Sequence, residues 1–144
     1  MKKMILFLVF ASTFFVLKAQ SPVGIWKSID DETGEAKSHI QLYEQDGKLM
    51  GKVVKFLKKD SDPNRVCSKC SDDRKGQKIM NMVILRDMSL KDNFYQGGKI
   101  LDPEKGKEYS CKIWLEAGNS NVLVVRGFVG FSVLGRTQKW YRVE

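Results

Sequence analysis

Between residues 23 and 143, short runs of apolar residues alternate with polar turn sequences at intervals of about ten residues. The run 107–116 shows this most cleanly, because every second residue from Tyr109 to Leu115 is apolar and the residues between are polar except Trp114. Such alternation places one face of a strand in a core and the other in water. No stretch of helical length has apolar residues at i, i+3, i+4 and i+7. The nearest, residues 84–91, has room for one or two helical turns.

The apolar runs predict eight or nine short strands, over residues 23–29, 38–44, 49–57, 78–86, 94–101, 107–116, 122–128, 129–134 and 136–143. Asp46-Gly47 marks a hairpin, because Gly tolerates the positive φ of a tight turn. Many short strands at even spacing favour an all-β barrel or sandwich, and the strand lengths favour the barrel. We therefore predict a small antiparallel up-and-down β-barrel of about eight strands, whose interior holds packed side chains or one small ligand.

One long polar stretch interrupts this pattern. Lys58–Gln77 contains Pro63 and Gly76 and has no periodicity. Structureless loops of this length are uncommon in compact domains and tend to be functional or mobile. The stretch is therefore a candidate contact surface.

The first 19 residues have the layout of a secretory signal peptide. Two lysines follow Met1, 14 uncharged residues come next, and Ala19 is a small residue at a plausible cleavage point. The uncharged stretch is shorter than the roughly 20 residues of a membrane-spanning helix, which disfavours the alternative of an uncleaved anchor. We expect residues 1–19 to be removed and a single domain, residues 20–144, to be periplasmic or secreted, with no membrane span after cleavage.

The distribution of charge along the chain argues against nucleic acid as a partner. The chain has a formal net charge of +8, which falls to +5 when Lys2, Lys3 and Lys18 leave with the signal peptide (8 − 3). The remaining basic residues are scattered among acidic ones, with no basic stripe interleaved with aromatics. Nucleic acid is therefore not an expected partner.

A set of short motifs occurs in a fixed order along the chain: Gly24-x-Trp26, Asp46-Gly47-x-Leu49-x-Gly51, Cys67-x-x-Cys70, Gly97-Gly98-x-Ile100-x-Asp102-Pro103, Gly106-Lys107-x-Tyr109-x-Cys111, Val125-Arg126-Gly127 and Gly130-x-Ser132-x-Leu134-Gly135-Arg136-Thr137-x-x-Trp140-x-Arg142. In order and spacing these motifs resemble the DUF2147 family of secreted bacterial proteins, over essentially the whole mature chain. One departure is Asn81, where the pattern has Gly. The resemblance implies a lipocalin-like barrel and no assigned activity.

The two ends of the domain resemble a lipocalin-type barrel closure. Gly24-x-Trp26 lies in the first expected strand, and Trp140-x-Arg142 lies in the last. In such a closure a Trp plugs the barrel base and an Arg lies over it, through a cation–π contact and hydrogen bonds to carbonyls. Arg142 and Arg136 are both candidates for that Arg, and Arg142 is slightly preferred. This interpretation is structural, not catalytic.

Cys67-Ser68-Lys69-Cys70 is the sharpest chemical feature, and four interpretations are open. A local Cys67–Cys70 disulfide is favoured for an oxidising compartment. Thiol–disulfide catalysis needs the first Cys at a helix N-terminus, which the surrounding sequence does not predict. A metal site would need Cys111 and His39 as further ligands, since one C-x-x-C is half a zinc signature. Cys111 could also pair with one of the loop cysteines.

The remaining polar residues do not predict catalysis. His39 is the single histidine, which leaves little material for a His-based metal site or a Ser-His-Asp triad. The paired carboxylates lie in polar turns, where they rarely act as general acids or bases. We therefore expect no catalytic residue, no metal and no cofactor, and we interpret the protein as not an enzyme.

Three functional hypotheses follow. The first is a barrel that binds a small apolar ligand in its interior. Its candidate cavity lining is Met50, Val54, Phe56, Met82, Ile84, Tyr109, Cys111, Ile113 and Leu115. The second is an envelope interaction module that binds a protein partner through the Lys58–Gln77 loop. The third, least favoured, is a redox protein using Cys67 and Cys70.

Overall fold

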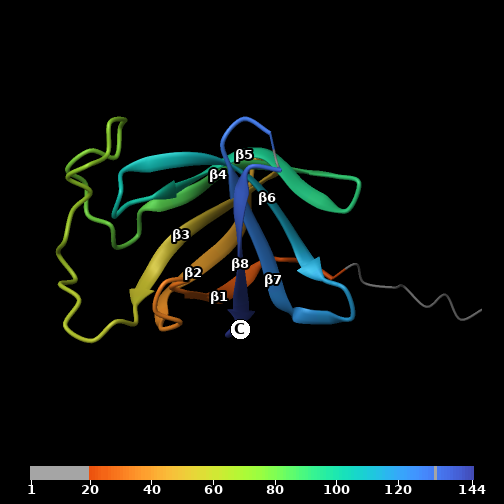
Figure 1. The fold of residues 1–144 in the computed structure, drawn as a ribbon, viewed down its shortest axis with the longest axis horizontal. Helices are drawn as coiled ribbons and strands as arrows, with labels where there is room; N and C mark the ends of the chain where they lie inside the picture. The colour runs from red at the N-terminus through yellow and green to blue at the C-terminus, as the bar shows by residue number, and fades with distance from the viewer. Residues whose placement is uncertain (1–19, 132) are drawn as a thin grey trace, which may run out of the picture.

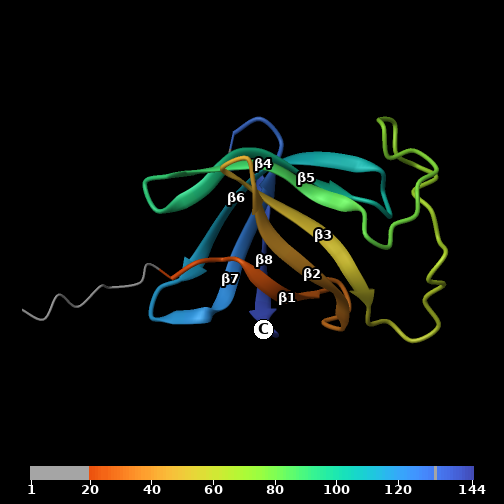
Figure 2. The same cartoon turned by 180° about the vertical axis from the view of Figure 1, so that it is seen from behind.

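The computed structural model describes residues 20–131 and 133–144, so the predicted signal peptide lies outside the described residues. Eight strands form one closed antiparallel barrel in which each strand pairs with the next and β1 pairs with β8 (Figures 1 and 2). The strands are β1 (Gly24–Ile29), β2 (Ala36–Gln45), β3 (Lys48–Phe56), β4 (Val83–Lys91), β5 (Phe94–Asp102), β6 (Lys107–Glu116), β7 (Asn119–Phe128) and β8 (Gly135–Arg142). The predicted all-β, up-and-down barrel is confirmed.

The two ends of the barrel differ. Tight turns join β2 to β3, β4 to β5 and β6 to β7 at one end, where β1 begins and β8 ends. The β1–β2 turn, the 57–82 segment, the β5–β6 turn and the β7–β8 loop lie at the other end, and Figure 1 shows the 57–82 segment standing off to the left. We call the end with the three tight turns the closed end, and the end with the 57–82 segment and the β7–β8 loop the open end.

Side chains fill the interior near the closed end. The most deeply buried large ones are Trp26, Leu42, Leu49, Leu85, Met88, Ile113 and Leu123. Burial of a side chain of this size contributes about 1.5–3 kcal/mol relative to exposure. This packed half therefore provides the main hydrophobic core, and the open half is not filled in the same way.

A β-bulge in β3 changes which residues face the interior. Leu49, Gly51 and Val53 are buried in regular alternation, but the pairing with β2 shifts next to Val54, between the pairs His39–Lys55 and Ile40–Val53. An extra residue in one strand reverses the inward phase beyond it, so Phe56 faces inward as Val53 does. The prediction that Met50 and Val54 line the interior is wrong, because both lie on the outer face.

Three other segments differ from the sequence-based expectations. Residues 84–91 belong to β4 and are not helical, and the described residues of 129–134 form no strand. The strand expected from Lys78 begins instead at Val83. Asn81 has a φ of 65°, a conformation that Gly adopts freely and that Asn tolerates better than most residues. Among the described residues, no helix is long and apolar enough to span a membrane.

Candidate functional site

A cavity of about 370 Å³ occupies the open half of the barrel. Its walls are mainly apolar and come from all eight strands and from the 57–82 segment. They include Ile40, Val53, Phe56, Ile79, Ile84, Ile100, Tyr109, Val125 and Trp140. Charged side chains surround the mouth, among them Asp30, Asp31, Glu32, Lys37, Arg65, Asp102, Glu104, Lys105 and Arg136. The cavity is therefore apolar within and polar at its entrance.

Two tryptophans lie on the side of the cavity that faces the closed end. Trp140 lines the cavity, is 2% exposed, and donates its ring N–H to Oε1 of Gln138 at 3.2 Å. Trp26 is fully buried nearer the closed end and donates its ring N–H to the carbonyl of Pro22 at 2.7 Å. Both ring donors are satisfied, so these large side chains seal the base without an unpaired polar group.

The closure predicted from the two chain ends is present with Arg142 as its arginine. The Arg142 guanidinium lies 4.3 Å from the centre of the Trp26 ring, and Gly24 packs where a Cβ would collide with the carbonyl of Glu144. Arg136 is not part of the closure, so that candidate is wrong. It lies at the open end in an ion pair with Asp31, because β8 begins there.

The mouth is held by ion pairs between segments far apart in the sequence. Lys58 lies 2.6 Å from Asp30, and its hydrogen bond lowers the pKa of that carboxyl to about 2. Glu104 contacts Lys37 at 3.1 Å and Arg65 at 3.5 Å. These pairs join the β1–β2 turn, the 57–82 segment and the β5–β6 turn around the entrance.

Arg65 combines apolar and polar contacts at the cavity wall. Its guanidinium lies 4.2 Å from the centre of the Phe56 ring. Its Nε is buried and has no hydrogen-bond partner among the described residues. A buried donor without a partner is costly, and a polar group near it would relieve that cost.

The 57–82 segment forms one wall of the cavity. Ile79 and Arg65 line the cavity, and the N–H of Ile79 donates to the carbonyl of Arg65 at 3.0 Å. A short bridge pairs Val66 with Lys78. The stretch predicted to be irregular is therefore folded back on itself against the barrel.

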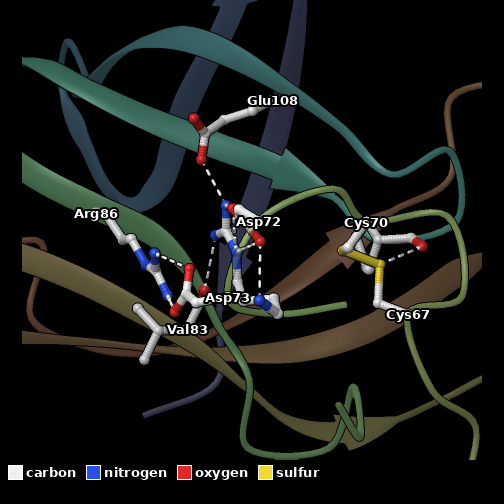
Figure 3. Close-up of polar contacts among 9 residues, drawn as sticks. Cys67, Cys70, Asp72, Asp73, Val83, Arg86 and Glu108 are labelled. Carbon is white, nitrogen blue, oxygen red and sulfur yellow. Dashed lines mark hydrogen bonds and ion pairs between the residues drawn. A yellow bond between two sulfur atoms is a disulfide. The ribbon is translucent and has the colours of Figure 1, made fainter. Parts of the chain in front are cut away.

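The Cys67–Cys70 disulfide predicted from the sequence is present (Figure 3). Both cysteines are buried, at 0% and 1% exposure. A Cβ on Gly106, in the β5–β6 turn, would collide with the backbone of Lys69. The disulfide loop therefore packs tightly on a turn that borders the cavity mouth.

Arg74 attaches the same segment to the outside of the barrel. Its side chain is 4% exposed and lies 2.5 Å from both Asp72 and Glu108 of β6 (Figure 3). It also donates to the carbonyl of Val83 at 3.1 Å. The hydrogen bond from Arg74 lowers the pKa of Asp72 to about 2. This cluster was not predicted from the sequence, because no motif near Arg74 or Glu108 indicates that the two side chains meet.

The other chemical candidates are separated in space. Cys111 is a buried free thiol, and burial raises its pKa to about 12. His39 lies on the outer face of β2, where partial burial and then the charges of Lys55 and Lys27 lower its pKa. Among the described residues, no group of three or more His, Cys, Asp or Glu side chains is placed to hold a metal ion.

Of the cavity-lining residues predicted from the sequence, the structure brings together Phe56, Ile84 and Tyr109. Six predicted residues do not line the cavity. Met50 and Val54 face outward, and the other four are Met82, Cys111, Ile113 and Leu115. All four are packed in or against the core. The lining also includes residues that the sequence pattern did not predict, namely Ile40, Val53, Ile100, Val125 and Trp140. The alternation of Ser38, Ile40 and Leu42 was a usable signal for the first of them.

The family comparison gives the family, and the structural comparison gives the fold. The DUF2147 family, described as "Uncharacterized protein conserved in bacteria", matches residues 24–142. No curated protein matches the chain. Among solved structures, HP1028 from Helicobacter pylori, described as belonging to the lipocalin family, matches with a TM-score of 0.74. The identity is 17%, and the match covers 88% of this chain and 85% of that one. At this identity the likeness shows the fold alone.

Proposed function

The chain belongs to the DUF2147 family, and from the cavity in its barrel we propose that it is a non-enzymatic carrier that binds one small, largely apolar molecule. The observation that carries the proposal is the space of about 370 Å³ between the packed base and the charged mouth. Small-molecule sites in proteins have volumes of about 300–1,000 Å³ and mainly apolar linings. This cavity falls in the lower part of that range.

The lining orients the ligand. Apolar side chains such as Ile84 and Val125 surround the interior, whereas Arg65, Lys37 and Glu104 stand at the entrance. Burying a charged group among the inner side chains would be costly, but a polar end at the mouth stays hydrated or hydrogen-bonded. The ligand therefore enters with its apolar part first.

The setting proposed for this carrier is outside the cytoplasm. The signal-peptide layout of residues 1–19 supports export, and a disulfide is a bond that oxidising compartments maintain. A local disulfide buried in the wall has a structural role, and its burial disfavours thiol–disulfide exchange as the function. The interaction module acting through Lys58–Gln77 stays an alternative.

Gly127 gives a direct test of the cavity. It lines the cavity, and the nearest atoms to a Cβ built there belong to Tyr109 and Ile100, at 3.6–4.0 Å. A Gly127→Leu variant therefore adds a side chain inside the cavity without a backbone clash. Asn121→Leu is the matched control, because Asn121 is an exposed position of the same strand.

The experiment is a titration of each protein with an apolar fluorescent probe such as 1-anilinonaphthalene-8-sulfonate, with circular dichroism to verify folding. We expect saturable binding of one probe per wild-type chain, a probe affinity at least about tenfold lower in Gly127→Leu, and no change in Asn121→Leu. Absence of saturable binding to the wild type, or equal affinities in all three folded proteins, would contradict the proposal.

A further inference from the structure

Four large apolar side chains project into solvent from the β7–β8 loop at the open end. Val129, Phe131, Val133 and Leu134 are 68%, 79%, 80% and 71% exposed. The loop forms the projection at the top of both ribbon views (Figures 1 and 2). Single exposed apolar residues are ordinary, but a contiguous group of this kind marks an interaction site. We call these four side chains the apolar rim.

The backbone of this loop is held in place by hydrogen bonds. The N–H of Leu134 donates to the carbonyl of Phe131 at 3.0 Å, and the N–H of Val129 donates to the carbonyl of Leu134 at 3.4 Å. Arg126 donates to the carbonyl of Val133 at 3.3 Å. The apolar side chains therefore point outward from a closed turn that is tied to β7.

The outer face of strands β5 to β7 is basic. Lys112 and Arg126 are paired across β6 and β7, and Lys99 is paired with Ser110 across β5 and β6. Nζ of Lys99 contacts the Ser110 hydroxyl at 3.0 Å, and Nζ of Lys112 lies 3.8 Å from the centre of the Phe94 ring. We call Lys99, Lys112 and Arg126 the basic wall.

The acidic residues of these strands do not cancel this charge. Strands β5 to β8 contain seven Lys or Arg and three Asp or Glu. Glu108 is bound by Arg74, and Glu116 is bound by Lys139. The third, Asp102, accepts hydrogen bonds from backbone N–H groups of its own turn. The basic wall therefore lies on the outer face of β5 to β7, and Arg126 joins it to the rim loop at the carbonyl of Val133.

We propose that the apolar rim and the basic wall dock the open end of the barrel onto an anionic lipid bilayer. Apolar side chains inserted at the headgroup level, together with basic side chains facing anionic lipids, are the two components of interfacial membrane binding. The charge complementarity selects the occupant, because a second copy of this chain would bring two basic walls together.

The docking brings the cavity entrance to the lipid. Val129 and Leu134 belong to both the rim and the cavity mouth, so the bound orientation places the mouth at the bilayer surface. The mouth carboxylates of Asp30, Asp31 and Glu104 face the bilayer as ion pairs with Lys58, Arg136 and Lys37. An apolar molecule would then pass between bilayer and cavity without crossing water. The docking itself does not depend on the cavity being filled, so it can be tested separately from the proposed function.

The experiment is co-sedimentation of residues 20–144 with vesicles of phosphatidylcholine alone and of phosphatidylcholine with phosphatidylglycerol. The test variants are Phe131→Ser/Val133→Ser for the rim and Lys99→Gln/Lys112→Gln for the wall. Leu90→Ser is the control for the rim, because Leu90 is 62% exposed on β4 near the closed end. All the substituted rim and control positions are exposed, so the variants should keep the wild-type thermal unfolding midpoint.

We expect wild type and Leu90→Ser to bind the anionic vesicles, and both test variants to partition at least about tenfold less. Gly127→Leu should bind vesicles as wild type does, even where it binds no probe. Absence of vesicle binding, or equal binding by the rim variant and Leu90→Ser, would overturn the proposal. So would a wild-type dimer that the rim variant dissociates while neither protein binds vesicles.

Discussion

The guanidinium of Arg142, in the last strand, lies 4.3 Å from the centre of the Trp26 ring in the first strand. The same guanidinium donates to the carbonyls of Val23 at 3.1 Å, Ser21 at 2.9 Å and Ser120 at 3.2 Å. One side chain therefore joins the N-terminal segment, β8 and the start of β7 at the closed end. The base of the cavity depends on this contact.

Replacement of Arg142 should loosen the barrel base. Arg142→Met removes the cation–π contact and leaves three carbonyls without their donor, so we expect a loss of about 1–3 kcal/mol in the free energy of unfolding. Arg136→Met is the control, since an exposed ion pair is worth about 0–1 kcal/mol. Urea unfolding measures both, and equal effects of the two substitutions would show that the closure carries no stability.

The Cys67–Cys70 disulfide should stabilise the wall of the cavity more than the whole fold. The cysteines are only three positions apart in the sequence, and closing so short a ring contributes about 2 kcal/mol in the chain-entropy model. We expect Cys67→Ala/Cys70→Ala to unfold at lower urea and to release a bound apolar probe faster, because the segment carrying Ile79 loses a constraint. A stopped-flow release rate equal to that of wild type would contradict this role.

Acid should weaken the attachment of the 57–82 segment. The hydrogen bond from Arg74 lowers the pKa of Asp72 in the folded protein from 3.8 to about 2. Because the pKa of Asp72 is lower in the folded protein, its ionised carboxylate stabilises the fold above pH 4. This stabilisation is lost as the pH falls from about 4 to about 2 and the carboxylate is protonated. The stability difference between wild type and Asp72→Asn should therefore narrow over this window.

Urea unfolding at pH 7, 4 and 2.5 measures this narrowing. Asp60→Asn is the control, because Asp60 is an exposed carboxyl of the same segment, and we expect the narrowing to be specific to Asp72→Asn. A wild-type advantage over Asp72→Asn that persists unchanged at pH 2.5 would rule out the linkage.

Cys111 should be unreactive in the folded protein. It is 1% exposed, and burial raises the pKa of its thiol to about 12. The thiolate is the reactive form, so labelling by 5,5′-dithiobis(2-nitrobenzoic acid) should be slow in native protein and rapid in denaturant. Without reductant, one thiol per chain should react in denaturant. Three reactive thiols, or none, would contradict the observed pairing.

The sequence predicted the barrel well because period-two alternation is a local signal. The run from Tyr109 to Leu115 shows it without ambiguity, and β6 has the predicted bounds. The inward face of β3 was predicted wrongly because a bulge next to Val54 reverses the phase, and nothing in the residues around it announces the bulge. Local patterns of apolar residues carry no record of such a shift.

The candidate site was less predictable, because it depends on contacts between distant segments. The disulfide and the Trp26–Arg142 closure were predicted from motifs. By contrast, the bond between Arg74 and Glu108 joins residues 34 positions apart and has no sequence signature. The division of the interior into a packed half and a cavity also depends on three-dimensional packing. Ile113 and Tyr109 share one face of β6, but only Tyr109 lines the cavity.

Native mass spectrometry tests directly whether the barrel cavity holds a small molecule. Wild type and Gly127→Leu would be purified from the same exporting cells, and their native and denatured masses compared. We expect a non-covalent small-molecule adduct on the native wild type that is missing from Gly127→Leu and from both denatured proteins. A wild-type protein that carries no adduct, or an adduct retained equally by folded Gly127→Leu, would contradict a ligand bound in this cavity.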